Sequence, residues 1–195
     1  GRDAAWAIGK DRLRNALAII DLAKDTMSEE AVSSYWSIQT ALSSLDRMEV
    51  RGRDSAGLQI FVTNESVDFS QTLNGSVSER LLNTLFTSGA LRIVGKSLVF
   101  VYKISSPIGE LGENTRELRK AITSDQLLNR CLNLPGSKVS VIGHTRWASV
   151  GIISEANAHP VNSTESEENS GPYVAAVLNG DVDNFADLKV SHRLS

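Results

Sequence analysis

The stretch RGRDSAGLQIFVT, residues 51–63, joins a polar, glycine-containing turn to an extended apolar segment. Leu58, Ile60 and Val62 alternate with other residues, so they fall on one face of a strand expected over residues 57–63. The glycines of the turn permit backbone conformations denied to other residues, so the turn can follow a helix closely. The stretch therefore predicts the end of a helix, a tight turn and the first strand of a sheet.

Two helices are expected before this turn. Residues 11–24 repeat apolar side chains at helical spacing, which predicts an amphipathic helix with one stripe in the core. The members of that stripe are Leu13, Leu17, Ile20 and Ala23. A second helix is expected to open with a capping box formed by Thr26 and Glu29 and to run toward Glu49.

The remaining residues mix strands and helices. The expected strands are 98–104, 138–142 and 173–178, and the expected helices are 78–86, 114–122 and 125–132, the second of them capped by Asn114. Residues 162–171 are rich in Ser, Glu, Asn and Thr and predict an exposed loop. This mixture is compatible with an α+β fold.

Length and composition indicate one globular domain, residues 1–195. Hydrophobic residues make up 41% of the chain and charged residues 22%, which is ordinary for a globular protein. A formal net charge of −3 gives no electrostatic reason to expect nucleic acid or an anionic membrane as a partner. The apolar runs are far shorter than the roughly 20 residues that span a bilayer, so no membrane segment is expected.

Cysteine and histidine usage narrows the chemistry further. Cys131 is the single cysteine and cannot form an internal disulfide, which favours a cytoplasmic location. It lies among leucines in an expected helix, so we interpret it as a buried structural thiol. Three scattered histidines give no metal-ligand spacing, and neither a metal nor another cofactor is expected.

Four polar blocks carry the functional signal. They are RGRDSAG at 51–57, GHTRWASVG at 143–151, EANAHP at 155–160 and VLNGDVDNF at 177–185. In this order they resemble the type 2 glutamine amidotransferases, whose nucleophile is an N-terminal cysteine. The His-Thr-Arg-Trp and Asn-Ala-His-Pro segments are most similar to the glutaminase domain of the sugar-phosphate aminotransferase branch, the glucosamine-6-phosphate synthases.

This resemblance implies a fold and a reaction. The implied fold is a four-layer αββα sandwich of two mainly antiparallel sheets, as in N-terminal-nucleophile hydrolases. The implied reaction hydrolyses L-glutamine to glutamate through a thioester and passes ammonia to fructose 6-phosphate, giving glucosamine 6-phosphate. A sugar-phosphate isomerase-type synthase domain is then expected C-terminal to residue 195, and a homodimer remains open.

The resemblance also assigns the substrate-binding residues. Arg146 matches the arginine that holds the α-carboxylate of glutamine, and a guanidinium suits that task because it forms two parallel charge-assisted hydrogen bonds. Trp147 matches an aromatic residue that covers the substrate, although core packing is an equally good interpretation. Ser149 keeps a hydroxyl where the branch has threonine, and His159 is expected to orient neighbouring groups.

The expected catalytic residues are Asn179, Gly180 and Arg51. Asn179 and Gly180 match the oxyanion hole, although an Asn-Gly pair on its own predicts a hairpin turn. Arg51 matches a loop that lies against the nucleophile's amine in relatives. Each of these roles comes from the resemblance.

The chain also departs from the family pattern at its N-terminus and in its spacing. It begins with Gly1, and the cysteine that should attack the carboxamide is not visible. Either the chain is clipped at both ends, which we favour, or the domain is a catalytically silent module that binds glutamine. An amidotransferase with another acceptor, such as phosphoribosyl pyrophosphate, is a further alternative. The long spacing from Gly57 to His144 also predicts an insertion around 78–134.

Overall fold

The computed structural model describes residues 1–24, 27–82, 91–105, 110–148, 151–163 and 172–192. A four-stranded antiparallel sheet with strand order β2-β3-β1-β4 lies at its centre. A second sheet pairs two short strands, β5 and β6, antiparallel. The strands are β1 Ser55–Thr63, β2 Leu91–Val94, β3 Ser97–Ile104, β4 Lys138–Arg146, β5 Val161–Asn162 and β6 Ala175–Ala176.

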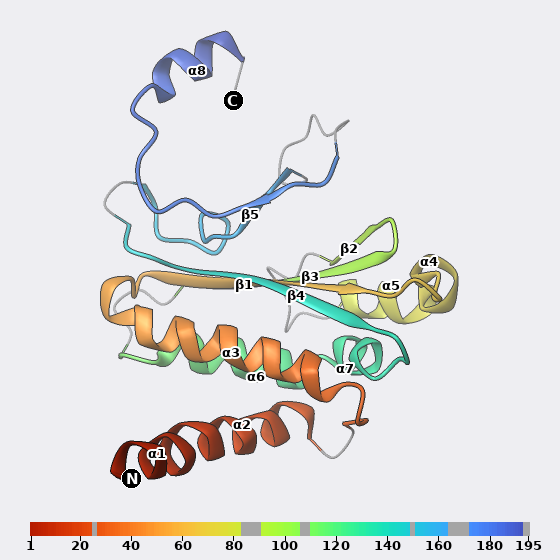
Figure 1. Cartoon of the computed structure of the whole chain (residues 1–195). Coiled ribbons are helices and arrows are strands. Elements are labelled where there is room, and N and C mark those ends of the chain that lie inside the picture. The colour runs from red at the N-terminus through yellow and green to blue at the C-terminus, as the bar shows by residue number, and fades with distance from the viewer. Residues whose placement is uncertain (25–26, 83–90, 106–109, 149–150, 164–171, 193–195) are drawn as a thin grey trace.

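Helices cover one face of the central sheet in two layers (Figure 1). Next to the sheet, α3 packs against β4, and α6 packs against β3 and β1. The outer layer is α2, which contacts both α3 and α6. The helices are α1 Arg2–Trp6, a π-helical segment Ala7–Arg12, α2 Leu13–Ala23, α3 Val32–Met48, a 3₁₀ turn Glu49–Arg51, α4 Phe69–Thr72, α5 Asn74–Leu82, α6 Glu113–Ser124, α7 Gln126–Leu132 and α8 Phe185–Ser191.

Strand β1 lies where the sequence predicted it and separates two environments. Leu58, Ile60 and Val62 are fully buried in the core between the sheet and the helices. On the opposite face, Gln59 accepts a hydrogen bond of 2.9 Å from the hydroxyl of Tyr173. Gln59 Nε2 also donates to the carbonyl oxygen of Pro160 at 3.3 Å. The segments around β5 and β6 are thereby attached to the face of β1 that the helices do not cover (Figure 1).

The α+β class is confirmed, and several predicted elements are confirmed with it. β3 and α7 coincide with two predicted elements, and α7 is capped by the side chain of Asp125. The four-layer sandwich stays a prediction, since the second sheet has two residues in each strand within the described ranges. No helix in those ranges is both long and apolar enough to cross a bilayer.

The predicted core stripe of the first helix is wrong for three of its four members. Leu13, Leu17 and Ile20 are each more than half exposed, whereas Ile19 and Leu22 are buried beside the expected Ala23. Polar contacts explain this rotation of the helix. Asn15 Oδ1 accepts a hydrogen bond of 2.9 Å from Gln39 Nε2, and Asp11 pairs with Arg47 at 3.0 Å. The face that carries these two residues must therefore point toward α3.

The predicted cap of α6 is also wrong. The helix begins at Glu113 after Gly112, and the buried carboxylate of Glu49 accepts the backbone N–H groups of Gly112 and Asn114 at 2.6 and 3.1 Å. The Asn114 side chain instead donates to the carbonyl oxygen of Arg53 at 2.7 Å. These bonds join the turn after α3 to the start of α6 and so hold the entrance to β1 in place.

Other boundaries differ by several residues. β4 continues to Arg146, beyond the predicted end at Ile142, because it pairs with β1 up to Ser55. β6 is shorter than the predicted strand 173–178, and α5 begins before the predicted helix 78–86. The end of that predicted helix lies outside the described residues. Thr26 of the predicted capping box also lies outside them. The predicted insertion at 78–134 stays a prediction. Within this segment, β3 pairs with β1, and both β3 and α6 contribute residues to the hydrophobic core.

Candidate functional site

Six of the seven predicted site residues line one pocket of about 320 Å³ near the end of β4. The six are Arg51, Arg146, Trp147, His159, Asn179 and Gly180. His144, Thr145, Leu178 and Asp181 complete its lining. Ser149 lies outside the described residues. Four separate chain segments, one from each of the polar blocks, therefore meet at this place.

The start of β1 fixes the end of β4. The N–H of Asp54 donates to the carbonyl oxygen of Arg146 at 3.1 Å, and Asp54 Oδ2 accepts the N–H of Ala148 at 2.6 Å. Gly52 lies so close that a β-carbon there would be 3.1 Å from the carbonyl carbons of both Thr145 and Arg146. The polar turn at 51–57 thus positions both Arg51 and the Arg146-Trp147 pair.

Arg146 presents the strongest anion-binding group of the pocket. Its side chain is half-buried, and Nη1 lies 3.5 Å from the carbonyl oxygen of Ile152. Its guanidinium has the fork geometry that binds a carboxylate through two hydrogen bonds. Arg51 adds a second positive charge to the lining and Asp181 a negative one. The pocket therefore offers both signs of charge to a small zwitterion.

Trp147 is 69% exposed, so the alternative that it packs in the core is wrong. It lines the pocket while most of its indole faces solvent. An exposed indole beside a pocket can cover a bound molecule and bury apolar area in doing so.

His159 organises the opposite side of the pocket. Its Nδ1 accepts the backbone N–H of Leu178 at 3.2 Å, which fixes the residue immediately before Asn179. Asn179 and Gly180 are exposed, and Gly180 has φ +153°, a conformation that L side chains rarely adopt. The turn therefore needs glycine at this position, and it carries an amide side chain and a backbone N–H into the pocket lining.

His144, from β4, also lines the pocket. Its ring lies 4.9 Å from that of His159, centroid to centroid, and its Nδ1 is buried without a hydrogen-bond partner among the described residues. Burial lowers its pKa below the ordinary 6.5. The nearby His159 and Arg146 lower it further, and a hydrogen bond to the Leu178 backbone opposes them. Burial and these two neighbours therefore disfavour the charged form of His144.

The lowered pKa of His144 predicts a loss of stability in acid. A neutral histidine binds fewer protons in the folded state than in the unfolded state, so stability should fall as pH drops below 6.5 and through the folded pKa. In urea unfolding at pH 7.5 and 5.0, His144→Asn should show a smaller acid-dependent loss than the unmodified chain. His192→Asn, at an exposed histidine after α8, is the control. An equal loss in the unmodified chain and His144→Asn would contradict this role.

Cys131 takes no part in this pocket. It is completely buried in α7, and burial raises the pKa of its thiol to about 12. The interpretation of Cys131 as a structural thiol is confirmed. No group of three or more His, Cys, Asp or Glu side chains in the described ranges is placed to hold a metal ion.

The pocket residues that the sequence did not single out all neighbour those that it did. Thr145 precedes Arg146, and Leu178 and Asp181 flank the Asn179-Gly180 pair. Thr145 lies in the 143–151 block, and its position next to Arg146 was the available signal. Asp181 is the one carboxylate in this lining, and its charge next to the Asn179-Gly180 pair was the available signal.

Comparison with known proteins points to one group of enzymes. The chain is 34% identical over 119 residues to the glutamine--fructose-6-phosphate aminotransferase [isomerizing] of Rhizobium meliloti, covering 60% of this chain and 16% of the relative. It is 27% identical over 155 residues to the Corynebacterium glutamicum enzyme of the same name, covering 80% of this chain and 16% of that enzyme. The Chlamydia pneumoniae enzyme is 46% identical over 50 residues, 26% of this chain and 7% of the enzyme.

These enzymes are distant relatives of the chain. No model of a known protein family matches it, and no solved structure matches it. The chain spans about a sixth of the length of the curated relatives it matches. The relationship therefore supports an amidotransferase-like role and does not by itself assign a reaction to the chain.

Proposed function

We propose that the chain provides the glutamine-binding half of a type 2 glutamine amidotransferase. The observation that carries this proposal is the convergence of Arg146 with Asn179 and Gly180 on one pocket. The sequence resemblance assigns Arg146 to the α-carboxylate of glutamine and assigns Asn179 and Gly180 to the oxyanion hole. An amino-acid-sized substrate needs both in the same cavity.

The pocket supports a definite arrangement of L-glutamine. Arg146 holds the α-carboxylate, and Asp181 accepts hydrogen bonds from the α-ammonium group. The side-chain amide of Asn179 and the N–H of Gly180 receive the negative charge that develops on the carboxamide oxygen during attack. Such oxyanion donors each lower a barrier by about 2.7 to 4 kcal/mol. Trp147 covers the bound molecule and excludes water from it.

The attacking group is the part of this proposal that the pocket itself does not supply. The pocket lining has no thiol, and Cys131 is buried elsewhere with a raised pKa. In the type 2 amidotransferases the thiol belongs to an N-terminal cysteine, and we propose the same source in the complete protein. Arg51, a cation in the pocket lining, would lie near that residue and favour its thiolate form.

The acceptor of the ammonia is proposed from the names of the relatives. They are glutamine--fructose-6-phosphate aminotransferases, so the proposed acceptor is fructose 6-phosphate, bound by a synthase domain C-terminal to residue 195. A different acceptor, such as phosphoribosyl pyrophosphate, would use the same glutamine pocket. Assembly as a homodimer is part of the proposal only for the complete enzyme.

A second function would use the same glutamine-binding groups without catalysis. A domain that keeps the carboxylate clamp and the oxyanion donors without a nucleophile would bind glutamine and report its presence to a partner. Glutamine binding is common to both functions, and glutamate release separates them. A glutaminase assay on the complete protein with its native start makes the distinction, since release would exclude the silent module.

Glutamine binding should depend strongly on Arg146. Removing a charge-assisted bidentate contact costs about 2 to 3 kcal/mol, so Arg146→Ala should weaken the affinity for L-glutamine roughly 30- to 150-fold. Isothermal titration calorimetry of the chain measures this directly. Arg53→Ala is the matched control, because Arg53 is exposed, carries the same charge and does not line the pocket. Equal affinities of the two variants would contradict the assigned clamp.

A further inference from the structure

A second pocket, of about 300 Å³, lies between α2, α3 and α6 in the helical layers. Three arginines line it, Arg14 from α2 and Arg116 and Arg119 from α6. Asp46, from α3, is the single carboxylate in the lining. Within the lining, positive side chains outnumber negative ones, and Asp11, outside the lining, lies 3.9 Å from Arg14. None of the lining residues belongs to the proposed glutamine pocket.

One of these arginines is held in a fixed position. Arg119 Nη2 donates to Gln39 Oε1 at 2.7 Å, and Gln39 Nε2 in turn donates to Asn15 Oδ1 at 2.9 Å. Burial lowers the pKa of Arg119, while the negative charges of Asp21 and Asp46 oppose that shift. The guanidinium is therefore anchored and partly desolvated, and a further negative charge beside it would stabilise it.

Two buried polar groups in this lining lack a hydrogen-bond partner among the described residues. They are the hydroxyl of Thr115, a residue only 5% exposed, and Nη1 of Arg119. Buried polar groups are almost always hydrogen-bonded, so each such exception calls for an explanation. Both of these groups can donate a hydrogen bond, and an arginine nitrogen cannot accept one. The missing partner is therefore an acceptor.

The start of α6 does not explain the pocket. Its first N–H groups are already bonded to the carboxylate of Glu49, as described above. Side chains therefore remain as the groups that face the cavity.

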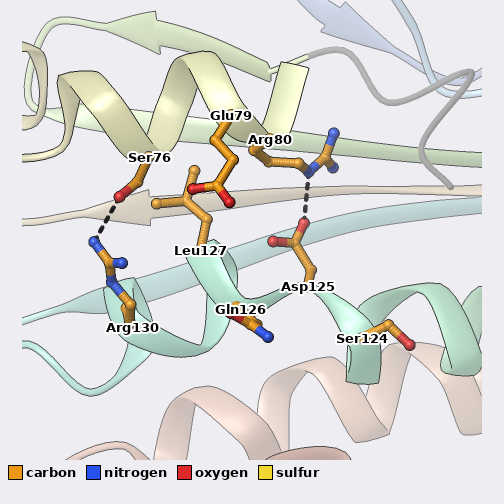
Figure 2. A pocket seen from close by; sticks show the side chains of 8 residues that line it. All are labelled: Ser76, Glu79, Arg80, Ser124, Asp125, Gln126, Leu127 and Arg130. Atoms are coloured by element: carbon orange, nitrogen blue, oxygen red, sulfur yellow. Dashed lines mark hydrogen bonds and ion pairs between the residues drawn. The ribbon is translucent and has the colours of Figure 1, made fainter. Parts of the chain in front are cut away.

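In a different pocket, between α5 and α7, the positive and negative side chains of the lining are equal in number (Figure 2). There Arg80 pairs with Asp125 at 2.8 Å, and Arg130 donates to the hydroxyl of Ser76 at 2.8 Å. Glu79 adds another carboxylate to that lining, so two arginines face two acids. The pocket between α2, α3 and α6 differs because its positive charges outnumber its negative ones.

We propose that the pocket between α2, α3 and α6 binds a phosphate group, either inorganic phosphate or the phosphomonoester of a small molecule. A phosphate has several strong acceptor oxygens and suits guanidinium groups that approach from two helices. Arg119 and the hydroxyl of Thr115 donate to its oxygens, and Arg14 and Arg116 neutralise its charge at the rim. The cavity volume leaves room for a small organic group attached to the phosphate.

Titration with inorganic phosphate tests the proposal on the chain as it stands. At constant ionic strength, phosphate should raise the Tm saturably, whereas chloride should not. Arg116→Gln should weaken phosphate binding about tenfold or more, since a charge-assisted contact is lost. Arg12→Gln is the matched control, because Arg12 is exposed and does not line the pocket. A Tm shift that chloride reproduces, or that Arg116→Gln leaves unchanged, would overturn the proposal.

The Thr115→Val variant tests whether the Thr115 hydroxyl binds a ligand or is simply a buried polar group without a partner among the described residues. Because the hydroxyl has no partner among the described residues, replacing it by a methyl group should leave the Tm without phosphate unchanged or higher. The response to phosphate should nevertheless become weaker by about tenfold. A higher Tm with an unaltered phosphate response would show that the hydroxyl binds no ligand. Repeating the titration with glycerol phosphate distinguishes the two sources, since tighter binding than inorganic phosphate identifies a phosphomonoester.

Discussion

Replacing Asp125 by alanine is expected to lower the free energy of unfolding by about 3 to 5 kcal/mol, because one partner of a buried ion pair is left uncompensated. Asp125 Oδ2 accepts hydrogen bonds from Arg80 Nε at 2.8 Å and from the hydroxyl of Tyr102 at 2.7 Å (Figure 2 shows the ion pair). The side chains of Arg80 and Asp125 are 3% and 1% exposed. Oδ1 also caps α7 by accepting the N–H of Leu128 at 3.1 Å.

Chemical denaturation of Asp125→Ala measures this loss, and two further variants locate its cause. Asp125→Asn keeps an acceptor for the helix cap and should lose less stability than the alanine variant. Asp11→Ala removes an exposed carboxylate that pairs with Arg47 at 3.0 Å, and its cost should stay below about 1 kcal/mol. A cost for Asp125→Ala as small as that for Asp11→Ala would contradict the buried-pair account.

Replacing Gly57 by alanine is expected to cost about 3 kcal/mol, at the upper end of the range for an overpacked core. A β-carbon at this position would lie 2.3 Å from the carbonyl oxygen of His159 and 3.0 Å from that of Tyr102. Both neighbours are backbone atoms and cannot turn away as a side chain can. The substitution should also weaken glutamine binding, because moving His159 disturbs its hydrogen bond from the Leu178 backbone.

Gly75→Ala provides the matched control for this prediction. Gly75 lies in α5, and a β-carbon there would meet nothing within 4 Å. Glycine within a helix is less favourable than alanine by roughly 0.5 to 1 kcal/mol, so this variant should be slightly more stable than the parent. Chemical denaturation of both variants tests the pair. A Gly57→Ala variant with unchanged stability would mean that the segment 155–160 does not lie against β1 as described.

Strand β1 and the extent of helix α6 could be predicted because the local sequence pattern and the tertiary environment agree there. In β1, alternate apolar residues are the ones that the helices bury. The rotation of α2 could not be predicted, because its apolar residues extend over a wide part of its surface. The hydrogen bond from Gln39 to Asn15 decides which part faces inward, and that bond joins two helices. Similarly, Glu49 replaces Asn114 as the cap of α6 through a contact across a long sequence separation.

The members of the candidate site were predictable, but their relation in space was not. Arg146 and Asn179 stand in separate sequence blocks, and nothing in either block states that the two share a pocket. The structure places both in the lining of one cavity through the pairing of β1 with β4 and the contact between His159 and Leu178. The roles assigned to these residues stay predictions.

A crystal structure of the chain soaked with L-glutamine would show directly where this substrate binds. The prediction is that its α-carboxylate lies within hydrogen-bond distance of the Arg146 guanidinium while its carboxamide oxygen faces Asn179 and Gly180. Glutamine bound outside this pocket, or bound in it with the carboxylate directed away from Arg146, would contradict the proposed function.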